Sequence, residues 1–408
     1  MPKKKARIPV SDLRGYVQLS IDAAIGVANL TQEIHQTILD RPEPFGAIAR
    51  GLTGGITSLV YNCVRGGLHL GGAGADWLLS KLDDGSAPEP SRNRDATRAA
   101  LNGICGDYLA AQANPLAIKM QLVSNGRVLP LERGAIAAAL PQASGRVVVL
   151  AHGLCMSERG WRRKKHDHGA ELARRLGLTP IYLRYNSGLH VSINGRAFAA
   201  TLDELTRQWP TPIEELIIIG HSMGGLVARS ACFYGEAAGH GWRRPLSAMI
   251  FLGTPHHGAP LEQLGAWVDH FLGKIPFASA FGRIGKARSA GVTDLRFGAL
   301  IDEDWRDRDP AALSGDCRRP IPLPEGVDCY AMAATKAGAA NKLHDRFLGD
   351  GLVPLASALG EHSDPARSLG FDPARQWIGK GMNHFDLLSR PAVSGQIVRW
   401  LQSGKPSA

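Results

Sequence analysis

Residues 220–225 read Gly-His-Ser-Met-Gly-Gly, and this G-x-S-x-G pattern restricts the fold more than any other part of the chain. The short, mostly apolar run 215–219, with three isoleucines, precedes it, and a segment able to continue as a helix, 226–231, follows. A sharp turn between a strand and a helix needs small residues at both ends. Such a turn exposes the hydroxyl of Ser222 as a candidate nucleophile. The alternative is a glycine-rich strand-to-helix turn that does no chemistry.

From residue 146 onward, apolar strand-like runs alternate with helical patterns. This alternation predicts an α/β fold with a mostly parallel sheet and helices on both faces. Asn125-Gly126 lies between two short strand-like runs and predicts a hairpin before this region. Residues 259–320 interrupt the alternation and are expected to form a cap or lid. Strands are expected at 147–150, 179–185, 215–219, 248–252, 327–333 and 376–378, and helices at 95–112, 167–177, 195–209 and 391–402.

The N-terminal quarter has a different pattern. Residues 10–40 carry apolar side chains at helical spacing, and residues 45–82 are apolar but rich in glycine. A polar, proline-containing stretch ends this part, so we expect a helical extension and linker over 1–94 and an α/β domain over 95–408. The extension is interpreted either as an ordinary docked helical segment or as a helical pair that touches a membrane surface.

Composition limits the class of protein. The chain has 408 residues, a formal net charge of +10 and six cysteines without a C-x-x-C pair, which argues against a disulfide framework or a zinc site. No apolar run is long enough to span a bilayer, and no apolar stretch of the signal-peptide type follows the basic N-terminus. We therefore expect a cytoplasmic protein, with peripheral membrane contact through the N-terminal region left open. No nucleic-acid-binding module accompanies the positive charge, so no nucleic-acid partner is expected.

A serine nucleophile needs a base within hydrogen-bond reach and an acid that orients the base. His384 follows the last expected strand, which is where the base should lie, whereas His344 and His362 come too early. Asp350, flanked by two glycines, follows the preceding strand and is the expected acid. Nearby alternatives for the acid are Asp345, Glu361 and Asp364.

The tetrahedral intermediate needs N–H donors for its oxyanion. The backbone N–H of Met223, directly after the serine, is one candidate. The second is the backbone N–H of Leu154, because His152-Gly153-Leu154 follows the strand at 147–150 and the glycine allows close approach to a ligand.

We predict no cofactor and no metal. The adjacent pair His256-His257 would point to opposite sides of an extended segment, and His166 and His168 are interpreted as surface residues. Asp386 is too close to His384 to orient it and is expected to cap a local helix. The basic cluster 159–165 is interpreted either as a solvated face or as a site that attracts anionic groups.

Four segments together resemble those of the α/β-hydrolase superfamily, and of bacterial triacylglycerol lipases and related esterases in particular: 152–154, 220–225, 253–258 and 349–354. The resemblance covers about residues 145–402. It implies cleavage of a small-molecule or lipid carboxylic ester by Ser222, Asp350 and His384 through an acyl-enzyme. The same residues would also suit a thioesterase, an amidase or a polyester hydrolase. A non-catalytic, membrane-associated interaction protein on a hydrolase scaffold is the alternative from a different class.

Overall fold

The computed structural model describes residues 9–39, 46–82, 91–260, 289–306, 316, 318–336 and 349–403. These residues divide between two compact units. One takes its residues from Met1–Ser91, Leu109–Ala117 and Lys274–Ala287, and the other from Arg92–Tyr108, Ile118–Gly273 and Arg288–Ala408. Most of the predicted cap, 261–288 together with 307–315 and residue 317, lies outside the described residues.

The larger unit is built on one eight-stranded sheet with the order β2-β1-β4-β3-β5-β6-β7-β8. The six strands from β3 to β8 run parallel, and the hairpin β1–β2 adds two antiparallel strands at the β4 edge. Asn125 and Gly126 both have positive φ, as the predicted hairpin turn requires. The mostly parallel α/β sheet is thus confirmed. The strands are β1 Gln121–Ser124, β2 Arg127–Val128, β3 Arg146–Ala151, β4 Thr179–Arg184, β5 Glu215–His221, β6 Leu246–Leu252, β7 Asp328–Thr335 and β8 Gln376–Lys380.

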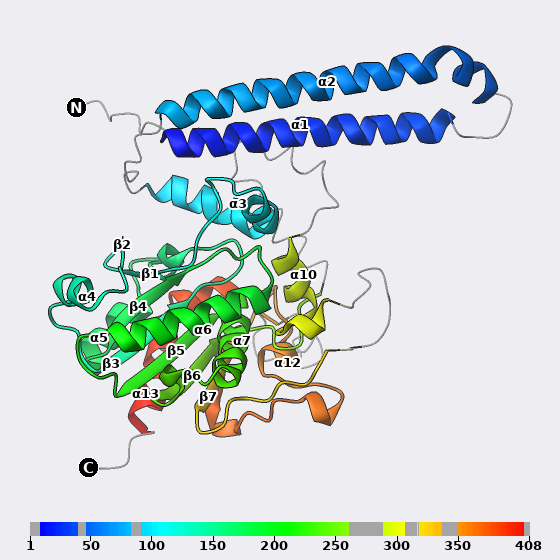
Figure 1. Cartoon of the computed structure of the whole chain (residues 1–408). Coiled ribbons are helices and arrows are strands. Elements are labelled where there is room, and N and C mark those ends of the chain that lie inside the picture. The colour runs from blue at the N-terminus through cyan, green and yellow to red at the C-terminus, as the bar shows by residue number, and fades with distance from the viewer. Residues whose placement is uncertain are drawn as a thin grey trace. The chain divides into compact units, whose positions relative to one another are not determined.

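Helices cover both faces of this sheet because alternate residues of each strand point to opposite sides. In β3, Val147 and Val149 belong to one apolar cluster, which also contains side chains of α6 and α7, whereas Val148 and Leu150 belong to a second cluster with side chains of α5 and α13. Figure 1 shows α6 and α7 side by side over the sheet. The helices of this unit are most of α3 Arg92–Ala111, whose last residues from Leu109 belong to the other unit, and α4 Arg133–Ala139, α5 His168–Leu176, α6 Val191–Gln208, α7 Met223–Ala237, α10 Ala290–Phe297, α12 Leu355–Ala358 and α13 Pro391–Ser403.

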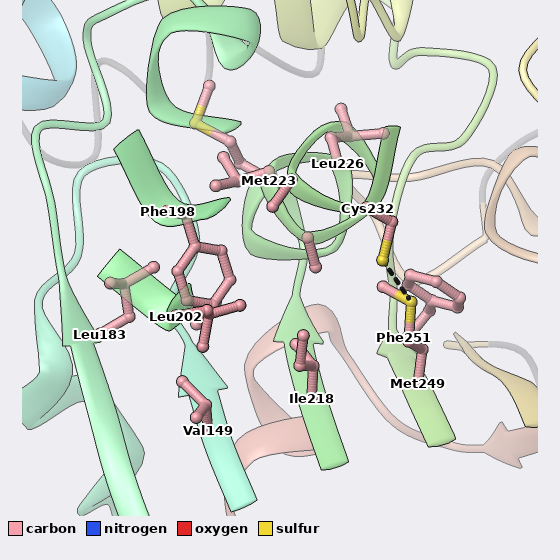
Figure 2. Close-up of a cluster of buried hydrophobic side chains, with 14 of the residues drawn as sticks. Val149, Leu183, Phe198, Leu202, Ile218, Met223, Leu226, Cys232, Met249 and Phe251 are labelled. Atoms are coloured by element: carbon pink, nitrogen blue, oxygen red, sulfur yellow. Dashed lines mark hydrogen bonds between the residues drawn. The ribbon is translucent and has the colours of Figure 1, made fainter. Parts of the chain in front are cut away.

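The first cluster fills the space beneath the start of α7. Figure 2 shows Phe198 and Leu202 of α6 reaching down toward Val149 of β3, with Ile218 of β5 beside them. Met223, the residue after Ser222, is fully buried above this layer. The tight packing anchors the first turn of α7, which fixes the position of the serine that precedes it.

The smaller unit is dominated by α1 Val10–Leu39 and α2 Gly46–Leu82, which lie side by side (Figure 1). The predicted first helix is confirmed, and the glycine-rich segment is a single helix of 37 residues. Asp76 of α2 accepts hydrogen bonds from Arg14 and Gln18 of α1. Gly72 leaves room for Ile21, because a Cβ there would lie 2.9 Å from Ile21 Cδ1. Pairing with α1 thus supports a helix whose glycines alone would weaken it. None of the described helices has the length and apolar character needed to cross a membrane.

Candidate active site

Ser222 occupies a strained turn between β5 and α7. Its φ of 53° and ψ of −124° are unusual for a residue with a Cβ, and such strain is held only where the surroundings enforce it. Gly224 makes the turn possible, because a Cβ there would lie 2.3 Å from the carbonyl oxygen of Ala151. The Ser222 N–H donates to the Leu252 carbonyl at 2.9 Å. The Ser222 hydroxyl is buried and makes no hydrogen bond with the residues that the structure describes.

Asp350 and His384, the predicted acid and base, are in direct contact. Asp350 Oδ2 lies 2.6 Å from His384 Nδ1, and both side chains are buried. The other carboxylate oxygen, Oδ1, accepts the backbone N–H groups of Leu352 and Val353, each at 2.9 Å. The flanking Gly351, with a φ of 94°, allows the chain to turn back for these bonds. The carboxylate is therefore fixed on both sides and can hold the imidazole in one orientation.

Two sets of contacts bring the His384 loop to the serine turn. Gly253 directly follows Leu252, whose carbonyl accepts the Ser222 N–H. A Cβ on Gly253 would lie 3.0 Å from His384 Cε1. His221 precedes the serine, and its Nε2 lies 3.3 Å from the His384 carbonyl oxygen. The rings of His221 and His384 have centroids 4.6 Å apart. The predicted nucleophile and the predicted base thus belong to neighbouring turns at the carboxyl ends of β5 and β8.

The predicted oxyanion donors also lie at this edge of the sheet. Leu154 and Met223 are fully buried. Met223 is the first residue of α7, so its N–H has no acceptor within the helix. Gly153 approaches the serine so closely that a Cβ there would lie 3.1 Å from Ser222 Cβ. The loop after β3 therefore needs a glycine where the sequence has one, next to the predicted nucleophile.

The loop after β4 holds the loop after β3, a relationship that sequence reasoning missed. The Tyr185 hydroxyl donates to the His152 carbonyl at 2.7 Å, and their rings stack with centroids 4.3 Å apart. Ser187 Oγ accepts the N–H of Cys155 at 3.1 Å. Burial lowers the pKa of His152 to about 4, so its ring is neutral at neutral pH. The available signal was that residues 185–187 directly follow β4, the strand that pairs in parallel with β3.

The basic cluster 159–165 contacts the loop that carries His384. Lys164 Nζ lies 3.0 Å from Asp386 Oδ1, and the Arg163 guanidinium lies 5.0 Å from the ring centre of Phe385. The other carboxylate oxygen of Asp386 accepts the Asn383 N–H at 3.2 Å, which is the predicted capping role. Part of the basic cluster therefore supports the histidine loop and is not simply a solvated face.

The three competing residues that the structure describes, Glu361, His362 and Asp364, are not assembled in this way. Asp364 caps a short turn through Ala366, and His362 lies 3.5 Å from Asp316. His344 and Asp345 lie outside the described residues. Glu361 is exposed.

The interpretation of His168 as a surface residue is wrong. Its ring is fully buried, where His168 Nε2 contacts the Leu387 carbonyl at 2.8 Å and its Nδ1 contacts His166 Nε2 at 2.9 Å. The sequence around it is polar, but its ring packs against Trp161 and His166 and contacts the turn that contains Leu387. Among the described residues there is no group of three or more histidine, cysteine, aspartate or glutamate side chains arranged to hold a metal ion.

Comparisons with known proteins agree with this architecture. The model of a family described as PGAP1-like alpha/beta domain matches residues 196–275, which include the serine turn, α7 and β6. The chain has the α/β-hydrolase fold. Ser222, the predicted nucleophile, follows β5. Asp350, the predicted acid, comes between β7 and β8, and His384, the predicted base, follows β8.

Solved structures with a similar hydrolase fold include lipases and esterases. The mature lipase BlEst2 of Bacillus licheniformis is 19% identical, with a TM-score of 0.40, over 63% of this chain and 91% of that one. A thermophilic esterase from Thermogutta terrifontis is 16% identical, with a TM-score of 0.37, over 64% and 91%. Phospholipase PlaB from Legionella pneumophila is 20% identical, with a TM-score of 0.32, over 52% and 44%. These likenesses are distant. No curated protein matches the sequence.

Proposed function

We propose that this protein is a serine hydrolase that cleaves carboxylic esters through an acyl-enzyme. The observation that carries the proposal is the buried contact of 2.6 Å between Asp350 Oδ2 and His384 Nδ1, beside a serine held at positive φ. A buried histidine oriented by a fixed carboxylate is the arrangement that activates a hydroxyl nucleophile.

In the proposed mechanism, His384 Nε2 takes the hydroxyl proton of Ser222 while the oxygen attacks the ester carbonyl. The N–H groups of Leu154 and Met223 stabilise the oxyanion of the tetrahedral intermediate. His384 then gives the proton to the leaving alcohol, and water hydrolyses the acyl-enzyme by the same steps in reverse. Asp350 keeps the imidazole in the tautomer with the proton on Nδ1 and stabilises its charged form.

Hydrolysis of p-nitrophenyl esters, from acetyl to palmitoyl, tests this proposal. The wild-type chain should turn over at least part of the series, and Ser222→Ala should lose that activity while remaining folded. Ser403→Ala, at the exposed end of α13, is the matched control and should retain full activity. The chain-length profile separates an esterase from a lipase. A folded wild type that turns over thioesters, amides or polyesters but not these esters would favour the alternative substrates with the same triad.

One observation favours a membrane-surface role for the smaller unit as well. In α2, Leu70 is 77% exposed and Trp77 63% exposed, and both lie on a helix that carries further exposed aliphatic side chains, namely Val60, Val64, Leu78 and Leu82. An apolar helix face of this kind can insert among lipid headgroups. The wild-type chain should float with anionic vesicles, whereas the double variant Leu70→Ser/Trp77→Ser should stay in the unbound fraction. Equal flotation of both would contradict a role for this face, whatever the outcome of the ester assay.

A further inference from the structure

The α/β unit contains a small cationic cavity that the proposed hydrolase mechanism does not use. It has a volume of about 20 Å³ and is lined by four arginines and one carboxylate, Asp304. The cavity lies between α7, the segment after β6 and the segment that leads into β7. Its arginines are Arg229, Arg318, Arg319 and Arg367.

Arg229, in the middle of α7, is the unusual member. It is only 4% exposed, and it forms no ion pair with any carboxylate of the described residues. Its Nη1 donates to His256 Nδ1 at 3.3 Å, and its Nη2 donates to the Ile321 carbonyl. Its Nε is buried and has no partner among the described residues. A buried guanidinium with neutral partners alone leaves its charge uncompensated, which is strongly unfavourable.

The neighbours of Arg229 add to the positive character of the cavity. Arg318 is 9% exposed and directs one end of its guanidinium to the carbonyl oxygens of His256 and Gly298 and the other end to Asp316. Burial and the charge of Arg318 lower the pKa of Arg229 to about 10, so Arg229 is still protonated at neutral pH.

His256 supplies a second buried donor. Because its Nδ1 accepts from Arg229, its proton is on Nε2, and this nitrogen is buried without a partner among the described residues. Burial and the charge of Arg229 hold the pKa of His256 well below its usual value, so the ring remains neutral.

The carboxylate in the cavity is already engaged. Asp304 Oδ2 accepts the N–H groups of Leu300 and Ile301, and its Oδ1 accepts the N–H of Arg319. It therefore caps the local backbone and does not pair with Arg229.

We propose that this cavity binds a monatomic, monovalent anion, with chloride as the physiological candidate, beside Arg229 and His256. A volume of about 20 Å³ is close to that of one or two water-sized spheres, which suits a monatomic ion. Arg229 and His256 of its lining each have a buried N–H without a partner among the described residues, and the lining has more arginine than carboxylate side chains. Arg319, which also lines it, is exposed, so an ion can exchange with solvent.

The test compares chloride with gluconate, an anion too large for the cavity, at constant ionic strength on the full chain. The Tm of the wild type should rise with chloride in a saturable manner, by about 2 °C. The ³⁵Cl NMR line should broaden in the presence of the protein and should narrow when bromide competes. Arg229→Gln should lose both effects. Arg174→Gln, an exposed arginine of α5 paired with Glu171, is the matched control and should retain them.

Two outcomes would overturn the proposal. One is a wild-type Tm and line width that do not depend on chloride, which would mean that the cavity holds water only. The other is the same saturable response in Arg229→Gln as in the wild type, which would place any bound chloride elsewhere. Where Arg229→Gln does not fold, Arg229→Lys replaces it, because this variant keeps the charge but lacks the Nε–H and should bind chloride more weakly.

Discussion

Asp350 and His384 are 34 positions apart in the sequence, yet their side chains meet at 2.6 Å in a site where both are buried. Asp350 also accepts two backbone N–H groups of its own loop, so the carboxylate does not depend on the histidine for its position. The histidine, in contrast, depends on the carboxylate for its orientation.

Asp350→Asn should therefore preserve the fold and reduce activity. An amide at this position can present its NH₂ group to Nδ1, which favours the tautomer with the proton on the wrong nitrogen. We expect kcat for a p-nitrophenyl ester to fall by about 10³–10⁴-fold. Asp364→Asn, at an exposed alternative acid that caps a short turn, is the control and should retain activity near that of the wild type. Comparable losses in the two variants would contradict the assigned role of Asp350.

Tyr185→Phe should affect the rate without affecting substrate binding. The variant loses the hydrogen bond to the His152 carbonyl, which holds the loop of the proposed oxyanion donor Leu154. We expect kcat to fall by about tenfold with KM nearly unchanged, because a small misplacement of the donor matters most in the transition state. Tyr330→Phe, in the N-terminal part of β7, is the matched control. A rise in KM at constant kcat would show that Tyr185 acts on binding and not on the oxyanion.

Gly224→Ala should be far more damaging than an ordinary glycine substitution. The added Cβ would lie 2.3 Å from the Ala151 carbonyl oxygen and 2.6 Å from that of His152, and neither backbone can move without shifting β3. We expect a fall in Tm and in soluble yield, because overpacking of this kind lowers the free energy of unfolding by about 1–3 kcal/mol or more. Gly134→Ala in α4, where a Cβ would meet nothing within 4 Å, should be neutral or slightly stabilising. Equal Tm values for both variants would be inconsistent with the packing of the turn.

The stability of the fold should fall on acidification through buried histidines. Burial lowers the pKa of His168 to about 4, below the ordinary value of 6.5. Between these two values the unfolded chain binds a proton at this histidine and the folded chain does not. The associated stability is fully present above about pH 6.5 and is lost as the pH falls toward 4. Within this window the free energy of unfolding should fall by up to about 1.4 kcal/mol per pH unit for this group.

His168→Gln tests this linkage. Its Tm should decrease less steeply between pH 6.5 and pH 5 than that of the wild type, even if the variant is less stable at pH 7. His69→Gln, at an exposed position of α2, is the control and should follow the wild-type curve. An unchanged slope in His168→Gln would show that other groups cause the acid sensitivity.

The sequence predicts the parts of this site that depend on chain order. The serine motif, the strand before it and the positions of Asp350 and His384 after successive strands follow from the topology of a parallel sheet. The choice of His384 over His362 also follows from order, because only His384 comes after the last strand. That choice agrees with the observed contact to Asp350.

Features that depend on burial could not be predicted in this way. His168 lies in a polar stretch, and its buried ring contacts the Leu387 carbonyl, more than 200 positions away in the sequence. Arg229 occupies an ordinary helical position, and its lack of a carboxylate partner emerges only from packing. The role of Tyr185 similarly requires the parallel pairing of β3 with β4, which places the ends of these strands side by side.

Labelling with an active-site-directed fluorophosphonate tests the central claim most directly. The proposed mechanism predicts one covalent adduct on the wild-type chain, located by peptide mass mapping on Ser222. Labelling should be much slower in His384→Ala and in Asp350→Asn. A folded, ester-cleaving wild type that carries no adduct, or that carries its adduct on another residue, would contradict the assignment of Ser222 as the nucleophile.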